Sequence, residues 1–304
     1  MSDTSPATEL ANINALLANA SVEMTCKDVS DLAEAATLLP AGTDIFIALF
    51  PNQTFEELTA ASAAVNAAGF IAVPHVPARR VKDVAEVRKI AQGFAAAGVT
   101  KMLLIAGDMP APEGAFDSTI GVLESGEFAA AGIKEMYMAG HPEGHGHMTT
   151  EQLRQYEARK VAVTNTQGVK LNFVTQVVFE PEPMIEWENT LRAHGITNQA
   201  RPGLPGPASL KTLLRYAKIC GAGASIRALG SGGKMALVAS LLGDSGPEES
   251  IRTLAKAQSS GKTNFGGLHF FAFGGFLKTC KFVSAMQNGR IKLDAKGEGF
   301  SVNV

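Results

Sequence analysis

The sequence has few cysteines, few aromatic residues and almost no net charge. Its 304 residues include 27 Lys and Arg against 29 Asp and Glu, which gives a formal net charge of −2 at pH 7. That balance argues against a polycationic nucleic-acid-binding protein and against an acidic disordered tail. Aromatic residues make up only 7% of the chain. We therefore expect a core built mainly from Ala, Val, Leu and Ile.

The spacing of the cysteines and the length of the apolar runs exclude further classes. Cys26, Cys220 and Cys280 form no C-x-x-C pair, so a zinc site of clustered thiolates is excluded and a disulfide framework is not expected. No apolar run approaches the ~20 residues that a membrane-spanning helix needs. The first residues lack the basic and apolar regions of a signal peptide. These features predict a cytoplasmic protein without a membrane partner.

Short apolar runs rich in β-forming residues recur along the chain. They cover residues 21–26, 44–50, 70–76, 101–107, 135–140, 170–176, 199–203 and 268–273. Apolar residues at helical spacing lie between several of these runs, at 55–68, 81–97 and 209–220. Most runs are continuous rather than alternating, which is typical of strands covered on both faces. Eight strands that alternate with helices predict an α/β protein with a (β/α)8 TIM-barrel fold.

We expect one domain over residues 1–304, since no convincing linker or internal repeat is present. A doubly wound open sheet is the competing fold. It is weakened because Lys27-Asp28-Val29, rather than a G-x-G-x-x-G motif, follows the first run. Residues 1–20 are interpreted as an N-terminal extension or helix. Residues 227–267 are rich in Gly, Ser and Lys and leave room for added helices.

Polar residues stand where the expected strands end, which is where TIM barrels gather their catalytic groups. Glu23 lies in the first run, His75 ends the third, Asp108 follows the fourth and Gln176 ends the sixth. Each also has a purely structural interpretation. Glu23 could pair with a buried cation, and Asp108 could cap a turn. His75, like His269 in the last run, could be a core histidine that bonds to a neighbouring group.

The segment 140–147 reads Gly-His-Pro-Glu-Gly-His-Gly-His and could supply zinc ligands. Its spacing does not suit one helix, and Gly and Pro favour a turn. We therefore predict a polar loop and no metal. A metal-dependent TIM-barrel hydrolase or lyase that uses His141, Glu143 and His145 remains an alternative function.

Taken in order, several short motifs resemble the methylenetetrahydrofolate reductase family in its compact bacterial form. They are Ser21-Val22-Glu23, Pro74-His75, Gly107-Asp108-Met109-Pro110, Pro142-Glu143-Gly144-His145, Arg159-Lys160, Thr175-Gln176, Pro202-Gly203, Leu210-Lys211 and His269-Phe270-Phe271. Each motif alone is weak, but their order matches the family from residue 21 to residue 283.

The resemblance implies a TIM barrel that reduces 5,10-methylenetetrahydrofolate to 5-methyltetrahydrofolate, with FAD carrying hydride from NADH or NADPH. The reverse direction is also allowed, and family members are often homo-oligomers. By position, Glu23 would be the general acid and Asp108 would lie near flavin and pterin. Gln176, Tyr216 and Thr212 would contact the folate. The cofactor-binding positions would be His75, Gly107, Asp108, His141, Glu143, His145, Arg159 and Lys160.

Several positions depart from the family pattern. Ala106 and Gly275 stand where the family has Arg, and His141 stands where it has Tyr. Leu153 and Tyr156 replace an Asp and an Asn, and Thr212 replaces a Gln. Most of these positions contact flavin or nucleotide in the family. The departures suggest that FAD is held differently or weakly, or that NADH reduces the folate directly. A folate-binding protein without turnover is a further alternative.

Overall fold

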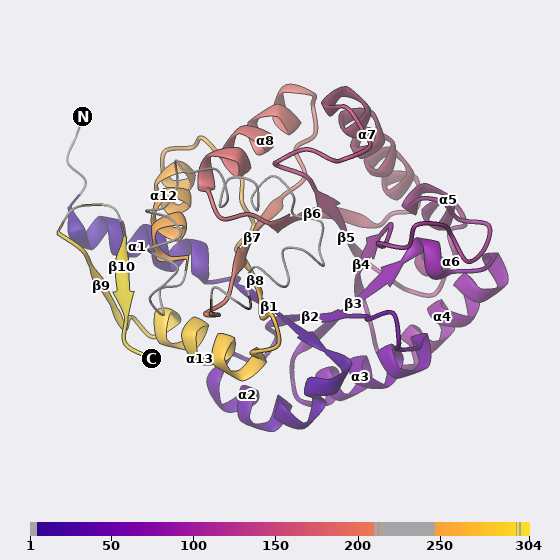
Figure 1. The fold of residues 1–304 in the computed structure, drawn as a ribbon, viewed down its shortest axis with the longest axis horizontal. Coiled ribbons are helices and arrows are strands. Elements are labelled where there is room, and N and C mark those ends of the chain that lie inside the picture. The colour runs from indigo at the N-terminus through magenta and orange to yellow at the C-terminus, as the bar shows by residue number, and fades with distance from the viewer. Residues whose placement is uncertain (1–4, 210–211, 213–246, 296, 298) are drawn as a thin grey trace. The chain divides into compact units, whose positions relative to one another are not determined.

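Eight parallel strands form a closed barrel in the computed structural model, which describes residues 5–209, 212, 247–295, 297 and 299–304 (Figure 1). The strands are β1 (Ser21–Thr25), β2 (Asp44–Ala48), β3 (Ile71–Pro77), β4 (Lys101–Ile105), β5 (Glu135–Gly140), β6 (Lys170–Val177), β7 (Ala200–Pro205) and β8 (His269–Phe271). Each strand overlaps one of the eight expected runs. The predicted (β/α)8 fold is therefore confirmed.

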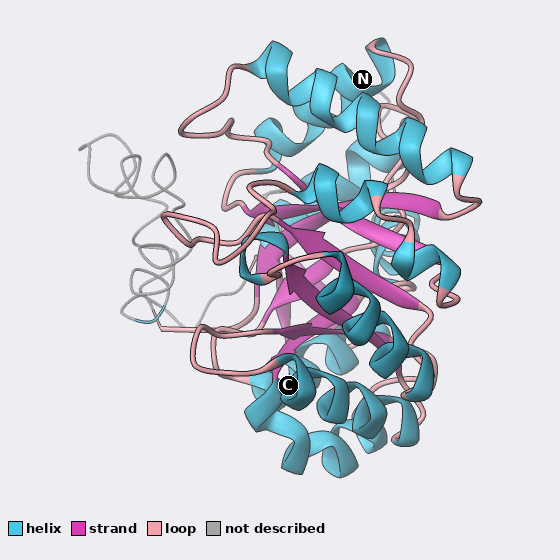
Figure 2. Cartoon of the chain, turned by 90° about the vertical axis from the view of Figure 1, so that its right-hand side faces the viewer, coloured by secondary structure: helices cyan, strands magenta, loops and turns pink. Residues whose placement is uncertain are grey.

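Helices alternate with these strands along the chain, and Figure 2 distinguishes the helices (cyan) from the strands (magenta). They are α1 (Pro6–Leu17), α2 (Leu32–Leu38), α3 (Phe55–Ala67), α4 (Val84–Ala96), α5 (Thr119–Glu124), α6 (Glu127–Ala130), α7 (Thr150–Thr166), α8 (Pro181–Ala193), α12 (Glu248–Ser259) and α13 (Phe276–Gln287), with 3-10 turns η1 (Cys26–Asp31) and η2 (Ala78–Arg80). A hairpin of β9 (Ile291–Leu293) and β10 (Phe300–Val302), which the sequence did not predict, follows α13.

The helix expected at 209–220 lies outside the described residues apart from Ser209 and Thr212. Within the segment 227–267, α12 occupies part of the described portion, and α1 precedes β1. Among the helices that the structure describes, none is both long and apolar enough to cross a membrane.

Hydrogen-bonded caps fix where two of the outer helices begin. At α3, Thr54 Oγ1 accepts from the Glu57 N–H at 3.1 Å, and the Thr54 N–H donates to Glu57 Oε2 at 2.6 Å. Thr149 and Gln152 make the same reciprocal pair at the start of α7. Such capping boxes satisfy backbone N–H groups that have no partner inside the helix. The loops that precede α3 and α7 therefore end at defined residues.

Residue contacts divide the chain into two sets, and each is described by itself. The first set comprises residues 1–22, 141–143 and 175–304, and the second comprises 23–140 and 144–174. In the first set Arg252 of α12 joins α1 to the C-terminal hairpin. Its guanidinium lies 2.6 Å from Glu9 Oε2 and 3.0 Å from Asp294 Oδ1.

In the second set the strands share one apolar cluster. Five successive strands, β2 to β6, each contribute one buried residue, and the five are Phe46, Val73, Leu103, Tyr137 and Val174. The Phe46 and Tyr137 rings meet edge to face with their centroids 5.0 Å apart. Layers of side chains taken from several strands are how TIM barrels fill their interior. This part of the barrel is a packed core.

A charged network lies at the amino ends of these same strands. Lys101 Nζ is 2.8 Å from Asp44 Oδ1 and 3.7 Å from Glu135 Oε2. The Tyr137 hydroxyl donates to Asp44 Oδ2 at 3.3 Å, and Asn172 Nδ2 donates to Glu135 Oε1 at 2.5 Å. The Asp44 side chain is only 4% exposed. A carboxylate this deeply buried is stable only with partners, because it has lost its hydration.

We predict that Lys101→Met destabilises the fold by about 2–4 kcal/mol, because removal of one partner leaves buried carboxylates without their cation. The free energy of unfolding in urea measures this. Lys89→Met is the matched control: the Lys89–Glu56 pair is 2.7 Å long, but its two side chains are 73% and 67% exposed. The control should change stability by less than about 1 kcal/mol. Equal losses of unfolding free energy in the two variants would contradict the view that burial makes the Lys101 pair important for stability.

Candidate active site

Glu23 stands in β1 with its carboxyl largely removed from water. The residue keeps some exposed surface, but the surrounding protein raises the pKa of its carboxyl to about 8, mainly through desolvation and secondarily through the negative charge of Asp28. Asp28 is fixed nearby because the Thr25 N–H and hydroxyl both donate to its Oδ2, at 2.7 and 2.8 Å. Among the described residues, no hydrogen bond or ion pair engages the Glu23 carboxyl. At neutral pH Glu23 is therefore mostly protonated and able to donate.

His75 lies in β3 against the aromatic core. Its ring meets Phe46 edge to face with the centroids 5.9 Å apart. Desolvation lowers the pKa of the buried imidazole to about 3, so the ring is neutral at physiological pH. In the part of the chain that the structure describes, its buried Nε2 has no hydrogen-bond partner. An orphaned buried nitrogen of this kind fits a polar ligand group.

His269 shows the contrasting, purely structural case. It is buried in β8, and its Nδ1 lies 3.0 Å from the Ser21 hydroxyl of β1. The interpretation of His269 as a core histidine bonded to a neighbour therefore fits the structure, whereas His75 keeps an unsatisfied nitrogen.

Asp108 lies near the start of the loop between β4 and α5, directly after Gly107. Gly107 has φ +88°, a conformation that favours glycine, and a Cβ there would lie 2.9 Å from Pro77 Cβ. The loop therefore turns tightly over the end of β3. Asp108 keeps exposed surface, but the protein on its other sides partly desolvates the carboxyl and raises its pKa.

A group of basic residues gathers near the start of α7. The pKa of His145 is lowered by desolvation and then by the positive charges of His147, Arg79 and Lys160. The His147 N–H donates to His145 Nδ1 at 3.2 Å, so a neutral His145 carries its proton on Nε2. Desolvation also lowers the pKa of Lys160, against the opposing charge of Glu157.

Arg159 and Lys160 are neighbours in sequence but occupy different surroundings. The Arg159 side chain is 55% exposed and pairs with Glu124 of α5 at 2.5 Å. Lys160 is more enclosed, and no ion pair holds its ammonium among the described residues. Lys160 is thus better placed than Arg159 to meet an anionic ligand.

The remaining expected residues belong to the other residue set. Gln176 is exposed near the carboxyl end of β6. The Thr212 N–H donates to Ser209 Oγ at 3.3 Å, and their hydroxyl oxygens are 2.9 Å apart. His141 and Glu143 follow β5 and both have interaction partners. Tyr216 lies outside the described residues.

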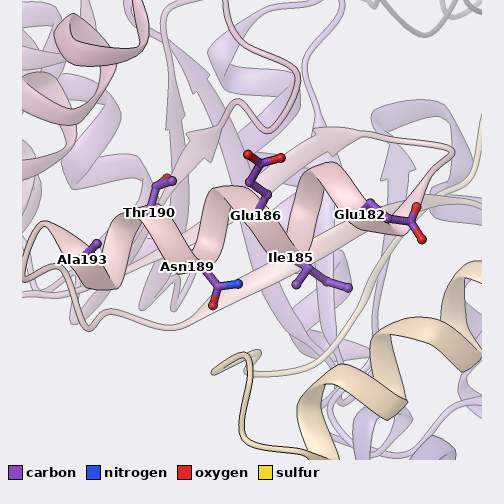
Figure 3. A pocket seen from close by; sticks show the side chains of 6 residues that line it. All are labelled: Glu182, Ile185, Glu186, Asn189, Thr190 and Ala193. Carbon is purple, nitrogen blue, oxygen red and sulfur yellow. The ribbon is translucent and has the colours of Figure 1, made fainter.

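Among the described residues no group of side chains suits a metal ion, and a surface pocket is lined by residues other than the expected ones. In the described ranges no three His, Cys, Asp or Glu side chains come together as metal ligands, so the alternative of a metal site at His141, Glu143 and His145 gains no support. A surface pocket runs along one face of α8 (Figure 3). Its lining residues are Glu182, Ile185, Glu186, Asn189, Thr190 and Ala193, and none was expected at the site.

Sequence reasoning missed the arginines of η2. Arg79 and Arg80 directly follow β3, and their guanidinium groups donate to backbone carbonyls of two neighbouring loops. Two consecutive arginines after a strand were a visible signal, but nothing in the sequence said which loops they reach. The buried pair of Arg154 and Glu157 in α7, 2.8 Å apart, was also missed.

Comparison with known families bears on this arrangement. The family model described as methylenetetrahydrofolate reductase matches residues 22–227, more than half of the chain. The match begins within β1, next to Glu23, and includes strands β2 to β7. It also includes His75, Asp108, Lys160 and Gln176. The chain therefore belongs to the methylenetetrahydrofolate reductase family.

Proposed function

We propose that the protein reduces 5,10-methylenetetrahydrofolate to 5-methyltetrahydrofolate, with NADH or NADPH as the source of hydride. Family membership supports folate-related one-carbon reduction. The observation that carries the specific reaction is Glu23, a carboxyl that desolvation keeps protonated near neutral pH. A protonated acid is what opening of the methylene bridge requires.

In the proposed reaction, Glu23 donates its proton to a bridging nitrogen of the folate. The bond from that nitrogen to the methylene carbon breaks, and its electron pair stays on the nitrogen. The methylene carbon becomes part of an electrophilic iminium and accepts a hydride, which makes the methyl group. The nicotinamide is oxidised overall, and the Glu23 carboxylate regains a proton from water. Asp108, which belongs to the same residue set as Glu23, is proposed to orient the pterin.

Two residues of the second set fit a bound FAD. The orphaned Nε2 of His75 could bond a polar edge of the cofactor, and the enclosed ammonium of Lys160 could face its phosphates. FAD, when bound, would relay hydride from the nicotinamide to the folate. Arg159 fits less well, since its guanidinium is already paired with Glu124. Leu153 is buried and offers no polar contact.

Two measurements test this proposal together. Purified protein should oxidise NADH or NADPH only when methylenetetrahydrofolate is present, and its visible spectrum should be recorded before the assay. Flavin absorption near full occupancy supports relay through FAD. Turnover by colourless protein supports direct transfer from the nicotinamide. Failure to reduce the folate with either nucleotide, with or without added FAD, would sink the proposal.

We predict that Glu23→Gln lowers folate reduction by at least about 100-fold, because the amide cannot supply the proton. Steady-state oxidation of NADH with methylenetetrahydrofolate measures the loss. If the protein carries flavin, the rate at which NADH reduces it should stay largely unchanged. Glu56→Gln, at an exposed surface pair, is the control and should keep full activity. Turnover by Glu23→Gln at the wild-type rate would rule out the acid role.

The pH profile provides a separate prediction. Folate reduction should decline as pH rises through about 8, because Glu23 then loses the proton it donates. Asp28→Asn removes the neighbouring negative charge, which is the smaller cause of the raised pKa, so the midpoint of the decline should move to lower pH. The kcat of both proteins between pH 6 and 10 tests this. A midpoint that rises in the variant would contradict the assignment.

The Glu23 carboxyl should make the fold less stable at neutral pH than at acidic pH. The pKa of Glu23 is about 8 in the folded chain against an ordinary value of 4.5, so the folded state holds the proton more tightly. The stability that the folded chain gains from holding this proton is fully present below pH 4.5 and is lost as pH rises to about 8. Glu23→Gln should therefore be more stable than wild type at pH 7, by at most about 3 kcal/mol. Urea unfolding at pH 4 and pH 7 measures this, and equal differences at both values would contradict it.

A further inference from the structure

Two adjacent arginines connect the turn after β3 to both neighbouring loops. Arg80 donates from Nη1 to the Phe50 carbonyl at 3.0 Å and from Nη2 to the Gln53 carbonyl at 2.6 Å, in the loop between β2 and α3. Arg79 turns to the other side. Its Nη1 donates to the Met109 carbonyl at 2.8 Å, and its Nε donates to the Asp117 carbonyl at 2.9 Å. Both of its acceptors lie in the loop that carries Asp108.

Backbone hydrogen bonds join the same turn to the Asp108 loop. The Arg79 N–H donates to the Ala106 carbonyl at 3.0 Å, and the Glu113 N–H donates to the Arg79 carbonyl at 2.7 Å. The Ala115 N–H donates to the Lys82 carbonyl, also at 2.7 Å. The backbone bonds thus hold the start and the middle of the loop. The Arg79 guanidinium holds a point directly after Asp108 and a second point just before α5.

The loop also packs directly on the backbone of the β3–α4 segment. A Cβ at Gly114 would overlap the Lys82 carbonyl group, so only glycine fits at this contact. Residues 106–118 therefore take their path from contacts with residues 77–82. No helix or strand of their own supports them between β4 and α5.

We propose that Arg79 is a positioning residue that sets where Asp108 enters the active site, because its planar guanidinium anchors both ends of the Asp108 loop. The inference rests on the proposed function only in placing Asp108 at the site. Lysine could not replace this arginine. A guanidinium presents donors in fixed directions on a rigid plane, whereas an ammonium is one compact charge on a flexible stem.

Arg79→Lys tests the catalytic part of the proposal. We expect kcat for folate reduction to fall about 10- to 100-fold, since small displacements of a positioned group cost this much. The KM for the nicotinamide should stay within about twofold. Gly114→Ala should lower kcat in the same way, because it pushes the loop off Lys82 while the arginine side chain at position 79 is kept. Arg88→Gln, in an exposed ion pair with Glu127, is the control and should keep the wild-type kcat.

Hydrogen–deuterium exchange tests the positioning without any substrate. Arg79→Lys should speed amide exchange in residues 107–117 and leave residues 50–54 unchanged. Arg80→Lys should give the reverse pattern. Because exchange needs no turnover, it judges the inference even where the wild-type protein fails the folate assay. Unchanged exchange at 107–117 in Arg79→Lys, or an unchanged kcat in a protein that reduces folate, would overturn the inference.

Discussion

The proposed chemistry depends on one physical constraint, the removal of water from the Glu23 carboxyl. Desolvation favours the neutral acid and raises its pKa to about 8. The same burial with a nearby cation would have produced an ordinary ion pair and a carboxylate unable to donate. The barrel supplies no such cation to Glu23 among the described residues. The charge that acts on the Glu23 pKa is that of Asp28, which is itself negative. The fold thus gives up some stability at neutral pH to keep a proton available.

Buried polar groups in the second residue set serve two opposite purposes. At the amino ends of the strands, Asp44, Lys101 and Glu135 partner one another, and Tyr137 and Asn172 add hydrogen bonds. Farther along the strands, in the described part of the chain, His75 Nε2 has no hydrogen-bond partner and the Glu23 carboxyl is desolvated without a neighbouring cation. A partner offsets the desolvation cost of a buried charge, whereas an unpartnered buried group stays costly and marks a candidate binding or reactive site. The contrast separates the structural end of the barrel from the proposed catalytic end.

The departures from the family pattern have consistent physical consequences. Leu153 is buried on α7 as part of the core, and Tyr156 is 41% exposed, so the two residues that the resemblance sets against an Asp and an Asn have different surroundings. Arg159 is neutralised on the surface by Glu124. Ala106 contributes only its carbonyl, which accepts from the Arg79 N–H. These surroundings bear on the flavin-side positions that the resemblance implies, whereas the proposed acid Glu23 keeps a raised pKa.

The sequence by itself determined the fold. Continuous β-rich runs and apolar residues at helical spacing are local signals, and this pattern recurs along the chain for each of the eight strands. It also placed Glu23 within the first strand, His75 near the end of the third and Asp108 after the fourth, since position along a strand follows directly from the order of residues. Only the tertiary structure decided their chemical states, because burial and partners come from segments distant in sequence. It showed that His269 bonds to Ser21, whereas His75 Nε2 finds no partner among the residues that the structure describes. It also showed that Arg159 and Lys160 have different surroundings and that Arg79 reaches Met109 and Asp117. Contacts between residues that lie some 30 or more positions apart in the chain produce no periodic pattern in the sequence, so no sequence pattern could have predicted them.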